Sequence, residues 1–170
     1  MSEYDRTWIL AQAVMAAVVA EFALAAAADP SCTTIALPEL QYISNGDVPG
    51  DCELLAVALN RVYGVSMAQG MPTEEVAAQM CTHWRAAVFE IVLMRCAPIM
   101  DESATVDFAL VQESGEQVMR DGQIITRGIL RAYRADAFGI GPTLAFEDWA
   151  SIVAEGGLVG GRLNVRIGLL

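Results

Sequence analysis

The segment Glu155-Gly-Gly-Leu-Val-Gly-Gly-Arg-Leu-Asn-Val-Arg-Ile-Gly-Leu-Leu170 decides the fold of this chain. Four glycines in six residues, 156–161, predict a turn. Polar and apolar residues then alternate, with one set on each side: Arg162, Asn164 and Arg166 against Leu163, Val165, Ile167 and Leu169. A period of two is typical of a β-strand with one buried face. We therefore expect a final strand whose apolar residues lie in the core.

The composition predicts one folded domain over residues 1–170. The chain is 55% hydrophobic and 18% charged, a balance typical of a globular protein with a core. Its formal charge is -11, and all ten basic residues are arginine. Such an acidic chain is poorly suited to wrap nucleic acid phosphates. Two interpretations stay open: a surface that DNA passes without binding, or the acidic surface of an ordinary soluble protein.

The first 28 residues predict a long helix. From Trp8 to Ala28 only Gln12 and Glu21 are polar, and ten of these twenty-one residues are alanine, which favours a helix. An export signal or a membrane anchor would also be apolar. However, the residues before the run carry net negative charge, and Glu21 interrupts it. We therefore expect a soluble helix that packs on the domain or on a neighbouring subunit, with no membrane partner.

Two apolar segments predict the central strands of a sheet. Cys52–Tyr63 and Trp84–Cys96 are apolar on both faces at their centres, as strands of a covered sheet are. They are most simply an antiparallel pair. Two extended pieces precede them, at Cys32–Leu37 and Glu39–Ser44.

The connection between these two strands, residues 64–83, is unusually long. Thr73 followed by two acids is a capping pattern for a short helix. A connection of this length is either a projecting arm that contacts a partner or a flexible insertion. We expect an arm, with Met71, Glu74 and Glu75 as contact residues.

A helical region follows, from about Asp101 to Asp136. Its small and apolar residues recur at steps of three and four, the spacing of one helix face: Ala104, Phe108, Val111, Gly115, Val118, Gly122, Ile125, Ile129 and Ala132. The region forms either one helix or two that meet near Gly122. The glycines of the stripe predict close approach to the sheet. Four acids are expected mostly toward solvent: Asp107, Glu113, Glu116 and Asp121.

The last part of the chain, Leu144–Ala154 with Gly161–Leu170, predicts a hairpin. The order of elements then predicts an α+β fold: a mixed or antiparallel sheet with the long N-terminal helix and one or two further helices packed on one face. In this arrangement Arg162, Asn164 and Arg166 face solvent or a partner.

No catalytic, cofactor or metal site is apparent in the sequence. The one histidine, His83, has no serine and aspartate partners that specify a catalytic triad. It also does not complete a zinc set, because the four cysteines include no CxxC pair. Residues 156–161 lack the lysine of a phosphate loop and lead into a strand. Buried free thiols are expected, since Cys52 and Cys96 lie in apolar runs, although two disulfides stay open for a secreted protein.

Three segments carry a family resemblance. They are residues 50–63 (GDCELLAVALNRVY), 89–98 (FEIVLMRCAP) and 155–161 (EGGLVGG) with its closing strand. In this order, with a helix between, they resemble small neck proteins of long-tailed actinobacterial phages, especially the tail terminator. The absence of lysine fits a phage of a high-GC host. Leu158 departs from the family pattern, in which a cysteine often stands beside the glycines.

The resemblance implies a non-enzymatic subunit of a homo-oligomeric ring, typically a hexamer, without a cofactor. The ring would cap the tail tube, stop its growth and join it to the head side. The implied partners are the major tail tube protein, the head-side connector or stopper protein, and genomic DNA that passes through the lumen without specific binding. The implied location is the virion neck, with assembly in the host cytoplasm.

Three other functions compete with this one. Another neck component, such as a stopper or adaptor, belongs to the same broad class. A secreted small-ligand-binding domain would use residues 1–28 as its export signal and would contain two disulfides. An enzyme ranks last, because the sequence offers only His83 and ordinary carboxylates.

Overall fold

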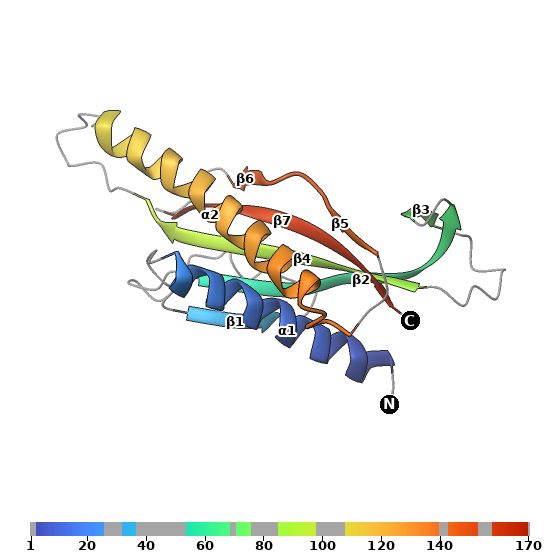
Figure 1. Cartoon of the computed structure of the whole chain (residues 1–170). Coiled ribbons are helices and arrows are strands. Elements are labelled where there is room, and N and C mark those ends of the chain that lie inside the picture. The colour runs from blue at the N-terminus through green and yellow to red at the C-terminus, as the bar shows by residue number, and fades with distance from the viewer. Residues whose placement is uncertain are drawn as a thin grey trace.

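Two helices pack on one face of a mixed β-sheet (Figure 1). The computed structural model describes residues 3–25, 32–36, 54–68, 71–75, 85–97, 108–139, 143–152 and 158–169. The helices in these ranges are α1 (Glu3–Leu24) and α2 (Phe108–Arg134). The strands are β1 (Cys32–Ala36), β2 (Leu54–Ala68), β3 (Met71–Glu75), β4 (Arg85–Cys96), β5 (Leu144–Phe146), β6 (Ala150–Ile152) and β7 (Leu158–Leu169). The predicted α+β fold is confirmed, and the described ranges hold one further helix after the N-terminal one.

The three long strands form the centre of the sheet. The strand order is β1-β2-β4-β7-β5, with β1 parallel to β2 and the other pairs antiparallel. The predicted antiparallel pairing of the two apolar segments is therefore confirmed in β2 and β4. Glu39–Ser44 lies outside the described residues.

Alternation along β4 and β7 separates the two faces of the sheet. Phe89, Ile91, Val165 and Ile167 are fully buried in the main core, beneath the helices. The other parity of β7 points away from the helices, because successive side chains of a strand alternate. Arg162 is exposed there, while Asn164 and Arg166 are half-buried. The predicted core face of the last strand, Leu163 to Leu169, is thus confirmed.

The glycine-rich segment is only partly the predicted turn. Gly160 and Gly161 lie inside β7, where they pair with Met94 and Leu93. A Cβ at Gly160 would overlap the carbonyl oxygen of Leu93, and one at Gly161 would overlap the ring of Trp149. These glycines therefore serve close packing, and the strand begins at Leu158 rather than at Gly161. Gly156 and Gly157 lie outside the described residues.

Two glycine-to-alanine substitutions should change stability in opposite directions. Gly160→Ala forces a methyl group against the β4 backbone, so we expect a loss of about 1–3 kcal/mol. Gly115→Ala, in a helix with nothing within 4 Å of the added Cβ, should gain up to about 1 kcal/mol. Urea unfolding followed by circular dichroism measures both. A neutral Gly160→Ala would contradict the close strand contact.

The last hairpin is divided into two short strands. β5 and β6 both pair with β7, and Glu147–Trp149 separates them. The ring of Trp149 packs against the core and lies 2.7 Å from where a Cβ at Gly122 would stand. Gly122 therefore makes room for this indole rather than for a strand, which corrects the prediction.

The helix α2 is continuous through Gly122, so the one-helix alternative is the correct one. Its buried residues begin only at Val118. Phe108 and Val111 of the predicted core stripe are exposed, and nothing lies within 4 Å of a Cβ at Gly115. The expected burial of Phe108 and Val111 and the expected close approach of Gly115 to the sheet were both wrong. The reason is that the stripe continues beyond the part of the helix that covers the sheet.

The helix α1 lies on the sheet beside α2, as predicted for the N-terminal segment (Figure 1). Val14, Val18 and Phe22 are fully buried against the core. Residues Arg6–Leu24 are long and apolar enough to cross a membrane by length and composition, and 44% of that stretch is buried inside the protein.

A two-stranded ribbon extends β2 beyond the sheet. The last β2–β4 pair joins Gly64 to Arg85, whereas Val65–Ala68 pairs with β3. The end of β2 bends away from the other strands there (Figure 1). Thr73 to Glu75 therefore form part of a strand, and the predicted short helix is wrong at these residues. Residues 76–84, which include His83 and Trp84, lie outside the described residues.

Candidate functional site

The first third of α2 extends away from the sheet (Figure 1). We call residues 108–117 the overhang. Within it only Ser114 and Gln117 are even partly buried. Phe108 is 80% exposed and Val111 50% exposed, and both lie on the stripe that continues into the buried face of the helix. A continuous apolar stripe that leaves its own core indicates a surface for another protein.

The outward side of α1 is also apolar. Trp8, Ile9 and Leu24 are exposed, and the exposed positions between them are Gln12, Ala16, Ala20 and Ala23. The spacing of 16, 20 and 23 places these alanines on one stripe. The helix is thus apolar on the side that packs on the sheet and also on the side that faces outward. A surface helix normally carries polar residues outside.

The seam between α1 and α2 contains a buried acid. Glu21 of α1 is 4% exposed, and Arg131 Nε lies 3.2 Å from its Oε2. Arg127 Nε lies 3.8 Å from Oε1. The helices cross closely at Gly128, where a Cβ would stand 2.8 Å from the carbonyl oxygen of Ala17. This pairing explains how an acid is tolerated in the apolar N-terminal segment.

The guanidinium groups of this seam also reach the surface. Arg127 and Arg131 keep 59% and 63% of their side chains exposed, and Arg134 is exposed as well. Their spacing of four and three residues places all three on one side of α2. The overhang carries Glu113 and Glu116 on that same side, because fourteen residues separate Glu113 from Arg127, about four helical turns. One side of α2 is therefore acidic in the overhang and basic beside α1.

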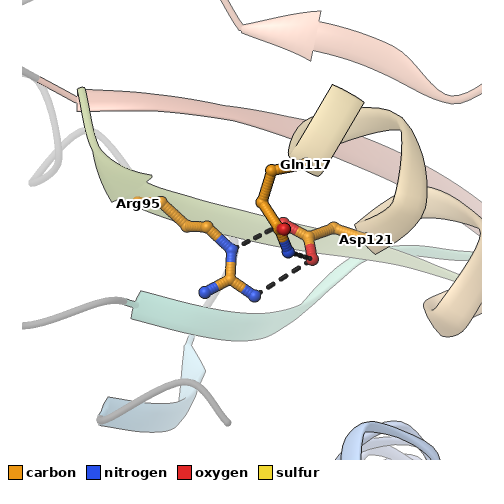
Figure 2. A network of polar contacts seen from close by, with 3 residues as sticks. All are labelled: Arg95, Gln117 and Asp121. Carbon is orange, nitrogen blue, oxygen red and sulfur yellow. Dashed lines mark hydrogen bonds and ion pairs between the residues drawn. The ribbon is translucent and has the colours of Figure 1, made fainter. Parts of the chain in front are cut away.

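A buried ion pair fixes α2 on the sheet. Arg95 of β4 donates two hydrogen bonds to Asp121 of α2, at 2.6 Å from Nε and 3.0 Å from Nη2. Gln117 donates a third to the same carboxylate at 3.0 Å (Figure 2). Asp121 is 2% exposed, so its predicted position toward solvent is wrong. The pair lies where the buried part of α2 gives way to the overhang.

The predicted contact residues of the last strand lie together on the outer face of the sheet. Arg162 Nη1 is 3.7 Å from Glu90 Oε1, and Arg166 Nη2 donates to Glu147 Oε1 at 3.3 Å. Asn164 is the cross-strand neighbour of Glu90. Each of these charges already has a partner within the chain.

A Tyr63 cluster adjoins this row. The guanidinium carbons of Arg61 and Arg166 lie 5.2 Å and 5.7 Å from the ring centroid of Tyr63, within cation–π distance. An irregularity in β2 between Leu59 and Arg61 shifts the alternation and places Tyr63 opposite Ala86. This part of the outer face thus holds paired charges around one aromatic ring, while a separate apolar cluster of Ala56, Val92 and Met94 is buried on the same face.

Met71, Glu74 and Glu75 lie on a different element from the predicted contact residues of the last strand. Within the described part of the chain, no contact joins the two groups. These three residues belong to β3, which pairs with the end of β2, and their side chains lie outside what the structure describes. The predicted contact residues therefore divide into a sheet-face group and a ribbon group.

The described residues offer little for chemistry on small molecules. They contain no group of three His, Cys, Asp or Glu side chains that is able to hold a metal ion. Cys96 is exposed rather than buried, which corrects the prediction for this thiol, and it is a free cysteine. The sequence matches no protein-family model and no curated protein.

The helical pattern in the sequence assigned two exposed apolar residues, Phe108 and Val111, to the core. Phe108 and Val111 follow the helical period correctly, but the period does not show where the sheet beneath the helix ends. The outer side of α1 carried a signal that was readable from the sequence, namely the near absence of polar residues on any side. Of the two alternatives predicted for this helix, packing on the domain is confirmed, and packing on a neighbouring subunit stays a prediction.

Proposed function

We propose that this protein is a structural virion protein, a tail terminator that forms a homo-oligomeric ring at the top of a phage tail. The observation that carries the proposal is the overhang, whose apolar side chains lack a covering surface in their own core. The outer side of α1 supports the proposal, since it is a second apolar surface at a different place on the same chain. A ring subunit needs two such surfaces, one for each neighbour.

The proposal assigns no reaction to the protein. Its partners would be copies of itself, the major tail tube protein on one side and the head-side connector on the other. The net charge of -11 suits a lumen through which DNA moves without binding. The resemblance of the β2, β4 and β7 segments to neck proteins supports the choice of the tail, and the location would be the virion neck after assembly in the host cytoplasm.

The proposal predicts rings in solution or at the tail. Light scattering of the purified protein should give a multiple of 18.2 kDa, and negative-stain images should show closed rings. Labelled antibodies should mark the neck of intact virions. A protein that stays monomeric and is also missing from virion necks would contradict the proposal.

A gene-disruption experiment separates the terminator from a stopper or adaptor. Because a terminator stops the growth of the tube, its loss should give tails of uncontrolled length. Loss of a stopper or adaptor should give tails of normal length that do not join heads. Tail lengths measured by electron microscopy distinguish the two outcomes.

A further inference from the structure

We infer that the overhang of one copy docks on the outer side of α1 and the adjoining arginines of the next copy. This inference rests on the proposed ring and names the contact that builds it. The occupant of each surface is a second copy of this chain. Two complementarities, of shape and of charge, support this choice.

The shapes of the two surfaces match. The overhang presents large side chains, above all Phe108 and Val111. The outer side of α1 presents alanines at 16, 20 and 23, which let another helix approach closely. Large side chains on one helix that face small ones on the other allow interdigitated packing.

The charges of the two surfaces are opposite. The overhang contains Glu113 and Glu116 and no basic residue, and Glu116 Oε2 lies 3.8 Å from Nη2 of Arg120, which follows the overhang by one helical turn. The α1 surface is bordered by Arg127, Arg131 and Arg134, whose side chains extend to the surface while two of them pair with buried Glu21. At 3.6 residues per turn, Glu116 lies about 80° around the helix from Phe108 and borders the apolar stripe, whereas Glu113 lies about 140° from Phe108 and faces away from a docked partner. A docked overhang would therefore bring the carboxylate of Glu116 toward these guanidiniums. The contact therefore selects one orientation of the incoming helix as well as one partner.

The geometry of the contact determines its symmetry. The overhang and the α1 surface are different parts of the chain, so the contact is head-to-tail. A head-to-tail contact leaves one free surface of each kind, and it closes into a ring when the rotation per subunit is right. The outer face of the sheet is less suited to this role, because among the side chains that the structure describes the exposed large hydrophobic ones all belong to α1 and α2.

Two variants with defects on opposite surfaces test the inference. Phe108→Ser with Val111→Ser removes the apolar part of the overhang, at positions that are exposed and tolerate polar residues. Ala16→Glu with Ala20→Glu places charge on the outer side of α1, where glutamate is also a good helix former. Each variant should fold normally by circular dichroism and should have the mass of a single 18.2 kDa chain by light scattering.

Mixing the two variants gives the decisive measurement. One intact overhang and one intact α1 surface remain, so the mixture should form a dimer of two 18.2 kDa chains and nothing larger. Two variants that assemble like the wild type, or a mixture that stays monomeric, would overturn the inference. Loss of assembly in Arg162→Glu alone would also overturn it and assign the contact to the outer sheet face, while rings at the neck would leave the proposed function standing. A wild-type protein without any oligomer overturns the docking, and its absence from virion necks would remove the proposed function too.

Discussion

Ile167→Asp should leave most of the protein unfolded in the absence of denaturant. Ile167 is fully buried in β7, between Ala87 of β4 and Leu144 of β5, beneath the helices. A carboxylate at this position loses its water and finds an apolar core around it. We expect a cost of about 4 kcal/mol or more, a large part of the stability of a typical domain. Far-ultraviolet circular dichroism and urea titration measure the loss.

The matched control is Arg162→Asp on the other face of the same strand. Arg162 keeps 57% of its side chain exposed, and its ion pair with Glu90 at 3.7 Å contributes little in water. We expect a change of about 1 kcal/mol or less. Arg166 is a less suitable control, since it is half-buried and also contacts Tyr63. Similar losses in Ile167→Asp and Arg162→Asp would mean that the two faces of β7 are wrongly assigned.

The final strand was predictable because alternation depends on the strand alone. A period of two over residues 162–169 identifies which side is buried without knowledge of the neighbouring strands. The long apolar runs of β2 and β4 likewise indicate strands covered on both sides at their centres, and Leu55 to Ala58 are buried as expected. These features are local, so one segment of sequence is enough to find them.

The glycines at 160 and 161 show where local patterns fail. A glycine pair is a good turn signal, but these two lie within β7 because the Leu93 backbone and the Trp149 ring occupy the space of their side chains. Both neighbours are distant in the sequence. The same holds for Asp121, which the helical pattern places near solvent until Arg95 from another strand pairs with it. Contacts between distant residues decide these positions, and a pattern within one segment does not contain them.

The candidate interaction surfaces were visible in the sequence only as apolar helices. Residues 108–129 repeat as one stripe, yet only the part from Val118 onward covers the sheet. The sequence of the helix does not indicate how long the sheet is or in which direction α2 crosses it. The division of the stripe into a core half and an exposed half therefore needed the structure.

Asp121→Ala should cost about 3–5 kcal/mol, because it removes the carboxylate that accepts two hydrogen bonds from the buried guanidinium of Arg95. Arg95 is 6% exposed, and its guanidinium carbon also lies 5.9 Å from the ring centroid of Phe22 on α1, so it is packed between both helices and the sheet. Glu113→Ala, which removes an exposed acid from the same helix, should change the free energy of unfolding by less than about 0.5 kcal/mol. Urea unfolding measures both variants, and equal small effects would contradict a tightly packed ion pair.

The double variant Arg95→Met with Asp121→Leu separates two roles of this pair. Apolar residues of similar size often replace a buried ion pair without loss of stability, so the double variant should unfold near the wild-type midpoint. Bidentate hydrogen bonds fix direction, however, whereas apolar contacts allow α2 to shift on β4. The overhang ends just before Asp121. A shift of α2 at this pair would therefore move Phe108 relative to the neighbouring copy. We therefore expect the double variant to be stable but to assemble less well in light scattering. Full assembly would show that packing alone holds the overhang in place, and a large loss of stability would show that the ion pair is needed for the fold itself.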